Sequence, residues 1–272
     1  MEILVEYAKA YLNIMNVYAN RYNWKLLYFD GFAGSGEIVK IVDDQLQFDA
    51  RITIGAARRI IEIDKPRSFD EYYFVEKDLN NFKQLEESTK KAFPKKKIFA
   101  TQDDCNKKML DLSNYLKNPK NKNYRTLAYI DPCGMQVEWR SIECLRGIPL
   151  DMWVLVPTGL GVNRLLKKNG QISDAWMEKL VKFLGLESEE IENHFYKKHQ
   201  NLFGEIVSMK VEDAIKKSAK LYFNRLKSVF EFFSNPYELR NSSNSVMYHL
   251  FLTSNNKSAI TIANDIVKKY NS

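Results

Sequence analysis

Five short apolar runs constrain the fold of this chain more than any other feature of its sequence. Runs that are apolar throughout are typical of parallel strands buried on both faces, and helical patterns lie between these runs. That alternation predicts a mixed α/β fold with a doubly wound, mostly parallel sheet. The runs are Leu26–Phe29, Tyr72–Val75, Ile98–Thr101, Thr126–Ile130 and Met152–Val156.

The other segments complete this architecture. Apolar residues at helical spacing over 2–22 predict a long amphipathic helix ahead of the first strand. The β-rich runs Val229–Phe233 and Ser245–Thr253 predict an antiparallel pair near the C-terminus. Residues 37–53 show no clean period, and we interpret them as an inserted excursion.

The segment 160–203 determines the predicted domain organisation. It is rich in Lys and Glu and contains amphipathic pieces, but it shows no strand pattern. We predict that it is a helical insertion that shapes a substrate cleft. Residues 1–159 and 204–272 then form one α/β domain.

Composition limits the class of protein. A net charge of +7 and a pI near 9.0 favour a polyanionic partner such as nucleic acid. The three cysteines, Cys105, Cys133 and Cys144, lack the spacing of a disulfide framework or a zinc site. No segment approaches the roughly 18 consecutive apolar residues of a membrane span, and the N-terminus lacks the pattern of a signal peptide. We expect a soluble, cytoplasmic protein without a metal site or a membrane association.

Acidic residues follow four of the five apolar runs. The carboxyl ends of parallel strands meet at one edge of a sheet, and ligands bind in the crevice outside that edge. We therefore expect these carboxylates to converge on one site. They are Asp30, Glu76, Asp103 or Asp104, and Asp131.

The stretch LYFDGFAGSG, residues 27–36, is the candidate ligand cradle. Its glycines either permit only a tight turn, or let the backbone approach a ligand while Glu76 accepts the hydroxyls of a ribose. The acids that follow the strands favour the second interpretation and imply an adenosine-containing cofactor. A nicotinamide dehydrogenase is disfavoured, because the loop lacks the GxGxxG spacing and Glu76 lies 40 residues beyond Gly36 rather than about 20.

Several motifs together carry a resemblance to a known family. DGFAGSG resembles the first motif of class I S-adenosylmethionine-dependent methyltransferases, VEKD their ribose-binding motif, QDDCN their adenine-contacting acid and IDPCG their catalytic motif. With the downstream PTGL, Asn163-Arg164 and the terminal YHLFLTS, the set is similar to the three-Cys-motif partner family. The similarity covers most of the chain and is weakest over 160–205.

The resemblance implies a Rossmann-like methyltransferase fold, with a seven-stranded sheet that ends in an antiparallel C-terminal strand. It also implies S-adenosylmethionine as cofactor, a three-Cys-motif partner protein encoded nearby, and a place in an antiviral defence or modification system. The cofactor-binding residues that it implies are Asp30, Gly31, Phe32, Ala33, Gly34, Ser35, Gly36, Glu76, Lys77, Asp104 and Cys105.

The candidate catalytic residues are Asp131, Pro132, Cys133 and Gly134. In amino-methyltransferases that act on bases, a D-P-P-aromatic motif holds an exocyclic amine while its ring stacks on the flipped base. Here Asp131 would orient the accepting group, but Cys133-Gly134 supplies no ring. Cys133 is either a nucleophile, as in cytosine-C5 methyltransferases, or, as we favour, a small, partly buried residue on the pocket floor.

Other residues leave two interpretations open. Arg164 either contacts a substrate phosphate or carboxylate, or is a solvated residue at a helix start. Trp139 either reaches the catalytic motif or belongs to the core. The run Lys95–Lys97 either is solvated or touches nucleic acid. His194 and His199 are five residues apart, which is a poor spacing for two metal ligands on a helix.

The leading hypothesis is an S-adenosylmethionine-dependent methyltransferase that acts on nucleic acid. The alternative is a catalytically silent, methyltransferase-like partner subunit that binds cofactor or nucleic acid in a complex. The altered IDPCG motif motivates the alternative.

Overall fold

The structure is a computed structural model, and it describes residues 2–36, 56–167, 171–200 and 206–271. The excursion predicted over 37–53 lies outside the described residues, as does part of the insertion predicted over 160–203.

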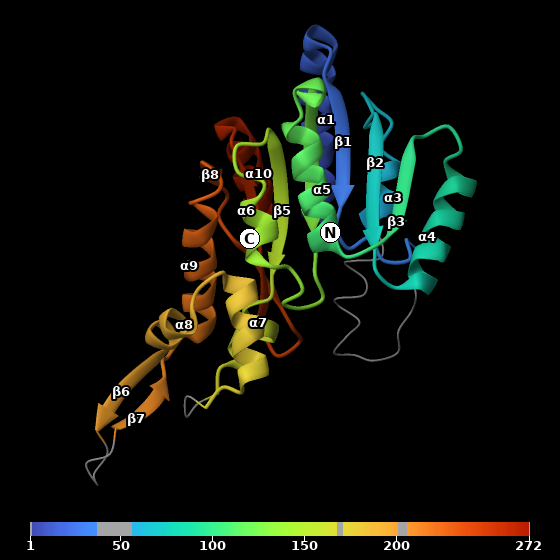
Figure 1. The fold of residues 1–272 in the computed structure, drawn as a ribbon. Helices are drawn as coiled ribbons and strands as arrows, with labels where there is room; N and C mark the ends of the chain where they lie inside the picture. The colour runs from blue at the N-terminus through green and yellow to red at the C-terminus, as the bar shows by residue number, and fades with distance from the viewer. Residues whose placement is uncertain (1, 37–55, 168–170, 201–205, 272) are drawn as a thin grey trace.

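The central sheet has the strand order β3-β2-β1-β4-β5-β10-β8, and β9 pairs with β10 in addition. The first five strands along the chain are parallel, and β10 lies antiparallel beside β5. This arrangement confirms the predicted mostly parallel sheet with an antiparallel C-terminal strand (Figure 1). The parallel strands are β1 Lys25–Asp30, β2 Glu71–Glu76, β3 Ile98–Gln102, β4 Tyr124–Ile130 and β5 Leu150–Val156.

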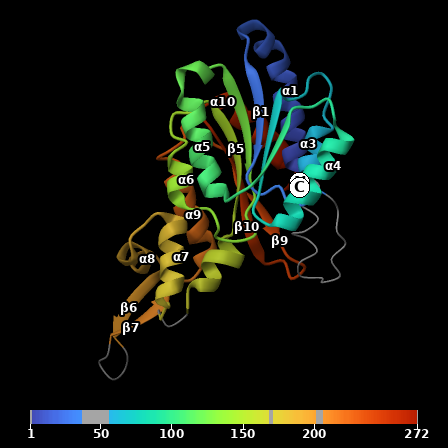
Figure 2. The ribbon, with the colours of Figure 1, turned by 45° about the vertical axis from the view of Figure 1, so that its right-hand side comes forward.

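Helices cover both faces of the sheet, and each face has its own hydrophobic core (Figures 1 and 2). Buried runs such as Leu150–Val156 contribute side chains to both cores, which is why these strands are apolar throughout. One face carries α1 Glu2–Tyr22, α3 Ala56–Ile61, α4 Leu79–Ala92 and α10 Lys257–Tyr270. The other carries α5 Cys105–Lys117, α6 Trp139–Glu143, α7 Asp174–Leu184, α8 Ser188–Phe195 and α9 Ala214–Leu226.

Aspartates begin the two helices that follow β2 and β3. The Asp78 carboxylate accepts the backbone N–H groups of Asn80 and Asn81, and the Asp104 carboxylate accepts that of Asn106. Each cap satisfies backbone donors that have no partner inside the helix. Both helices therefore start at the carboxyl edge of the sheet.

The prediction of a purely helical insertion over 160–203 is wrong. The segment begins inside the π-helix η2 Thr158–Asn163 and contains α7 and α8. It also contains the strand β6 Tyr196–Gln200. β6 pairs antiparallel with β7 Ile206–Lys210 in a ribbon outside the main sheet (Figure 1). The sequence of β6 gives no strand signal because all its side chains but Tyr196 are exposed, so pairing with β7 determines its conformation.

The antiparallel C-terminal pair is confirmed, but it is shorter than predicted. Only β8 Phe232–Phe233 pairs with β10 Val246–Ser254 from the first β-rich run. The polar segment between the two runs supplies a further strand, β9 Tyr237–Arg240, which pairs with the first half of β10. Among the described residues, no helix combines the length and apolarity that crossing a membrane requires.

Candidate cofactor and acceptor site

The acidic residues that follow the strands lie at one edge of the sheet, as the sequence predicts. β1 lies between β2 and β4, and Asp30 is level with Phe74 on one side and Tyr129 on the other. Glu76 and Asp131 each come within two residues of these positions. The carboxyl ends of the strands form the lower edge of the sheet in Figure 1.

The glycine-rich loop follows β1 and is built from hydrogen bonds to both neighbouring strands. The N–H of Gly31 donates to the Tyr129 carbonyl, and that of Ala33 donates to the Val75 carbonyl, both at 3.0 Å. Gly34 has a φ of +63°, and among the described residues no atom lies within 4 Å of the place where a Cβ would stand. The loop therefore presents open space above Gly34, in a conformation that side-chain-bearing residues rarely adopt.

Glu76 at the end of β2 is held against this loop. One carboxylate oxygen accepts the N–H of Gly34 at 2.9 Å, and the other accepts that of Asp78 at 2.7 Å. An ionised carboxylate has about four acceptor positions, so each oxygen retains room for a further donor. The side chain is only half-buried. Glu76 is thus fixed in position and is still able to accept ligand hydroxyls.

Asp104, rather than Asp103, faces the loop after β2. The Lys77 ammonium donates to Asp104 at 3.1 Å, whereas Asp103 binds Lys107 and Lys108 from the side of α5. Hydrogen bonds from Lys107 and from the Asp104 N–H lower the pKa of Asp103 to about 2. The sequence left this choice open, and the contacts favour Asp104.

Cys105 lies beneath the loop rather than in the open space above it. A Cβ on Gly31 would stand 2.5 Å from the Cys105 sulfur, so this close approach requires glycine at position 31. The thiol is buried, and burial raises its pKa well above the usual range. We infer that Cys105 supports the glycine loop and does not contact a ligand.

Two tyrosine–aspartate pairs lie side by side below the loop, and sequence reasoning missed them. The Tyr28 hydroxyl donates to Asp30 at 3.3 Å, and the Tyr129 hydroxyl donates to Asp131 at 2.7 Å. All four side chains are buried. Burial, and secondarily the nearby Asp131 charge, raise the pKa of Asp30 to about 7, against the bond from the Phe32 N–H. The signal was present as the repeated Tyr-x-Asp ending of two adjacent strands.

The fourth motif is more open than predicted. Asp131 is buried, but Cys133 is exposed, which corrects the expectation of a partly buried residue on a pocket floor. A Cβ on Gly134 would meet no atom of the described parts of the chain within 4 Å. The Tyr248 hydroxyl donates to the Cys133 carbonyl at 3.4 Å, yet its ring is buried in the core. The loop therefore has open space at Gly134, three residues after the buried Asp131, and no ring of its own.

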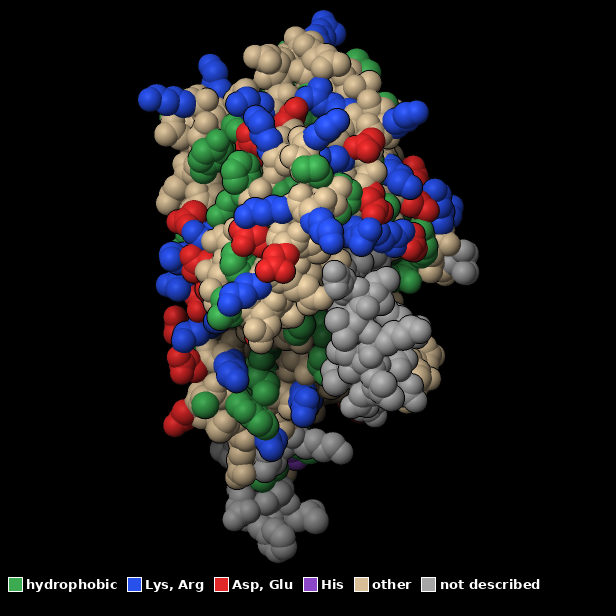
Figure 3. Space-filling model, turned by 90° about the vertical axis from the view of Figure 1, so that its right-hand side faces the viewer, with side chains coloured by type: hydrophobic (Ala, Val, Ile, Leu, Met, Phe, Trp, Pro, Cys, Tyr) green, Lys and Arg blue, Asp and Glu red, His purple; other side chains and the backbone are tan. Residues whose placement is uncertain are grey.

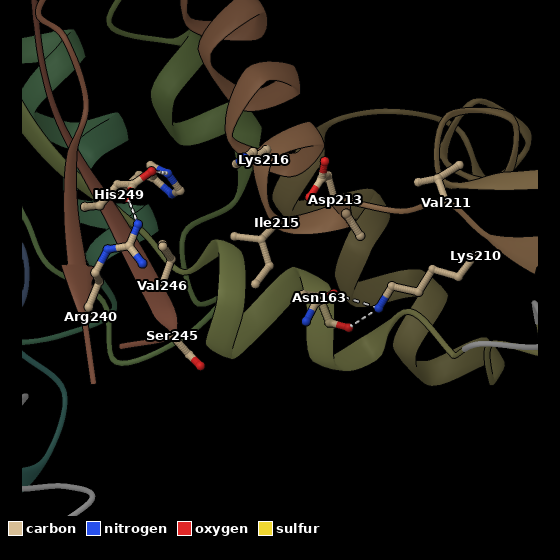
Figure 4. Close-up of a pocket in the computed structure, with 12 residues that line it drawn as sticks. Asn163, Lys210, Val211, Asp213, Ile215, Lys216, Arg240, Ser245, Val246 and His249 are labelled. Atoms are coloured by element: carbon tan, nitrogen blue, oxygen red, sulfur yellow. Dashed lines mark hydrogen bonds and ion pairs between the residues drawn. The ribbon is translucent and has the colours of Figure 1, made fainter. Parts of the chain in front are cut away.

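A cavity of about 520 Å³ lies beside the end of η2, at Asn163 (Figure 4). Its walls come from η2, the last residue of β7, the start of α9, and β9 with the start of β10. Buried His249 lines it, and its Nδ1 lies 2.7 Å from the hydroxyl oxygen of Thr158. Burial lowers the pKa of His249. The charged residues of the lining are Lys210, Asp213, Lys216, Glu238 and Arg240.

The structure also places the other candidate residues, Arg164 and Trp139. Arg164 follows η2 and is exposed, and it does not line this cavity. Trp139 is a core residue, since its ring packs edge-on against Tyr222 and lies under Arg225. The described residues contain no group of three or more His, Cys, Asp or Glu side chains that could hold a metal ion.

Comparisons with known proteins find only distant similarity. No protein-family model matches the chain, and a search of curated proteins finds no significant relative. Solved structures do align. Protein LPL1258 from Legionella pneumophila aligns with 13% identity and a TM-score of 0.47, over 98% of this chain and 91% of that one.

Trm1 from Pyrococcus horikoshii, solved with S-adenosyl-L-methionine, aligns with 11% identity and a TM-score of 0.46. That alignment covers 98% of this chain but only 57% of the Trm1 chain.

Proposed function

We propose that the protein is an S-adenosylmethionine-dependent methyltransferase that acts on nucleic acid. The observation that carries the proposal is Glu76, which bonds to the Gly34 N–H at the carboxyl edge of a parallel sheet. A carboxylate held at the end of the second strand beside a glycine loop is the arrangement that binds the ribose of adenosine cofactors in such folds.

The residues of the edge fit that cofactor. The space above Gly34 accommodates a group that approaches the backbone closely. Glu76 would accept the ribose hydroxyls, and Asp104, fixed by Lys77 and by its cap on α5, would accept the adenine amine. Asp30 would act through the loop, because one of its carboxylate oxygens accepts the Phe32 N–H and the other accepts the Tyr28 hydroxyl.

On the acceptor side, Asp131 would orient the group that receives the methyl. Tyr129 holds one of its oxygens at 2.7 Å, and this fixes the carboxylate at the end of β4. When bound, S-adenosylmethionine supplies an electrophilic methyl group. A substrate amine bound to Asp131 keeps its lone pair directed away from the carboxylate and available for attack.

A nucleic-acid substrate is proposed from the charge and openness of the site. The chain carries a net charge of +7, and positive proteins favour phosphate backbones. Open space at Gly134, in the loop that follows Asp131, would leave room for an extruded base. A partner protein and a role in defence remain predictions of the resemblance alone.

Calorimetry tests cofactor binding. We expect the protein to bind S-adenosylmethionine and S-adenosylhomocysteine, and Glu76→Gln to weaken binding by about 10- to 100-fold, because a hydrogen bond to a charged group contributes roughly 1.5–3 kcal/mol. The matched control is Glu87→Gln, which changes an exposed glutamate of α4. Failure of the wild-type protein to bind either compound would refute the proposal.

The exposed Cys133 and the missing ring favour a second candidate, a subunit that binds the cofactor without transferring methyl. Methyl-transfer assays with labelled cofactor on DNA and RNA separate the two. We expect transfer by the wild-type protein and at least a 100-fold loss in Asp131→Ala, which removes the oxygens that would orient the accepting group. Cofactor binding without transfer to any nucleic acid would favour the silent subunit.

A further inference from the structure

The end of the molecule opposite the candidate active site carries an exposed group of aromatic rings. Tyr18 and Tyr22 lie one turn apart on α1, and Trp24 follows in the turn that leads into β1. The Tyr18 and Tyr22 ring planes are 6° from parallel, and each lies 27° from the Trp24 plane. Centroid separations are 5.1–6.5 Å. We call Tyr18, Tyr22 and Trp24 the aromatic platform.

The platform is accessible to solvent. Tyr18 is 44% exposed and Tyr22 is 50% exposed. Of the eight large hydrophobic residues that are most exposed in the described parts of the chain, four lie on this half of α1: Ile14, Val17, Tyr18 and Tyr22. Figure 1 shows the last turns of α1 rising beyond the amino end of β1. Exposed apolar residues that gather on one segment, rather than being scattered singly, mark interaction sites.

Positive charge surrounds the platform. The Arg125 guanidinium lies 3.9 Å from the centre of the Trp24 ring, and that of Arg21 lies 5.4 Å from the centre of the Tyr22 ring. The loop with Lys120 and Lys122 reaches the same place, because the Asn123 side chain donates to the Asn23 carbonyl. Figure 3 shows Lys and Arg side chains gathered around this upper end of the molecule.

These cations are not neutralised by nearby carboxylates. Within the described ranges, none of Arg21, Lys25, Lys120, Lys122 and Arg125 forms an ion pair. The acids of this end are already engaged, since Asp70 binds Arg67 and Glu71 accepts the Tyr124 hydroxyl. The positive potential is therefore available to an anionic ligand.

We propose that the aromatic platform binds single-stranded nucleic acid. Exposed, near-parallel rings accept unstacked bases, and the surrounding cations contact the phosphates, which is the combination that sequence-tolerant single-strand binders use. A duplex would not satisfy the platform, because its bases are already stacked. The site is separate from the glycine loop, since the six residues of β1 place about 20 Å between them.

Binding of a labelled oligothymidylate of about a dozen nucleotides tests the proposal, with oligouridylate as the RNA arm. We expect Tyr18→Ala and Tyr22→Ala each to weaken binding roughly tenfold, since each removes one stacking surface. Leu79→Ala is the matched control, because Leu79 is 45% exposed at the other end of the sheet. Circular dichroism verifies that each variant is folded.

The charges are tested by the dependence of binding on salt. Arg21→Gln and Lys122→Gln should each lower the slope of log affinity against log salt by about 0.7, the value for one phosphate contact on a single strand. Lys83→Gln, on the exposed face of α4, should leave the slope unchanged. Ultraviolet crosslinking should attach the oligonucleotide to Tyr18, Tyr22 or Trp24.

Three results would overturn the proposal: no binding by the wild-type protein, unchanged binding in both tyrosine variants, or self-association that Tyr22→Ala abolishes while no oligonucleotide binds. The last result would identify the patch as an interface between copies of the chain. The platform variants leave the glycine loop intact. Their affinity for S-adenosylmethionine therefore tests the proposed function separately from the aromatic platform.

Discussion

At the scale of single residues, the buried carboxylates at the end of β1 and β4 are the most unusual feature of the molecule. Asp30 and Asp131 are only 1% and 3% exposed, and each accepts a hydrogen bond from a buried tyrosine two residues earlier. Two ionised carboxylates in one buried cluster disfavour each other, which is consistent with the pKa of about 7 for Asp30.

This pKa makes stability depend on pH. The folded protein retains a proton on Asp30 that the unfolded chain releases near its ordinary pKa of 3.8. The contribution of Asp30 to the free energy of unfolding therefore falls as the pH rises from about 4 to 7, by up to roughly 4 kcal/mol. Asp30→Asn, which can still accept the Phe32 N–H, should remove this fall. Urea unfolding at a series of pH values measures this pH dependence, and the exposed Asp265→Asn is the control. Parallel pH profiles for the wild type and Asp30→Asn would contradict the expectation.

At the scale of secondary-structure elements, the Lys210 side chain connects the β6–β7 ribbon to η2. The Lys210 ammonium donates to the carbonyl and side-chain oxygens of Asn163 at 2.8 and 2.7 Å, and to the Leu166 carbonyl at 3.0 Å. A cation at the C-terminal end of a helical segment satisfies its last carbonyls. Lys210 thereby connects β7 to the end of η2, beside the cavity of Figure 4.

Lys210→Met should loosen both elements while keeping the length of the side chain. We expect the free energy of unfolding to fall by about 1–3 kcal/mol, because buried acceptors lose a charged donor. Amide hydrogen exchange should increase at Gly161 and Val162, whose N–H groups bond to the Pro157 carbonyl. Lys198→Met, exposed on β6, is the control; equal exchange in both variants would show that Lys210 does not anchor η2.

At the scale of the whole molecule, a buried hydrogen-bond network joins the first helix to the end of the chain. Asp151 on β5 accepts the Tyr7 hydroxyl from α1 at 2.8 Å and the Ser254 hydroxyl from β10 at 2.5 Å. At the surface, Glu6 binds Lys269 and Tyr270 of α10. Helices from opposite ends of the sequence thus close the same face of the sheet.

Tyr7→Phe tests this closure. Removing one hydroxyl leaves buried Asp151 with one donor fewer, so we expect a loss of about 1–2 kcal/mol and a decrease in Tm of roughly 2–8 °C for a chain of this size. Tyr237→Phe, whose ring packs against Tyr270, is the control. An unchanged Tm would mean that packing alone holds α1 in place.

By itself, the sequence determined the parallel strands, the helices between them and the edge at which the acids gather. These follow from local signals. Apolar runs such as Leu26–Phe29 must be buried on both faces, and aspartates such as Asp78 and Asp104 are residues that favour the N-cap position of a helix. The glycine loop was also predictable, since a tight turn with a positive φ, such as the one at Gly34, favours glycine.

Only the tertiary structure decided the features that depend on distant partners. β6 and β9 are strands because β7 and β10 pair with them, although their own side chains do not favour it. Cys105 became a support rather than a ligand because Gly31 packs on its sulfur, and Tyr129 became a partner of Asp131 because both side chains lie on one face of β4.

The gathering of Tyr18, Tyr22, Trp24 and Arg125 into one surface also required the folded chain, since Arg125 reaches Trp24 only when β4 lies beside β1. Contacts between segments far apart in sequence leave no periodic trace in either segment, and folding alone brings them together.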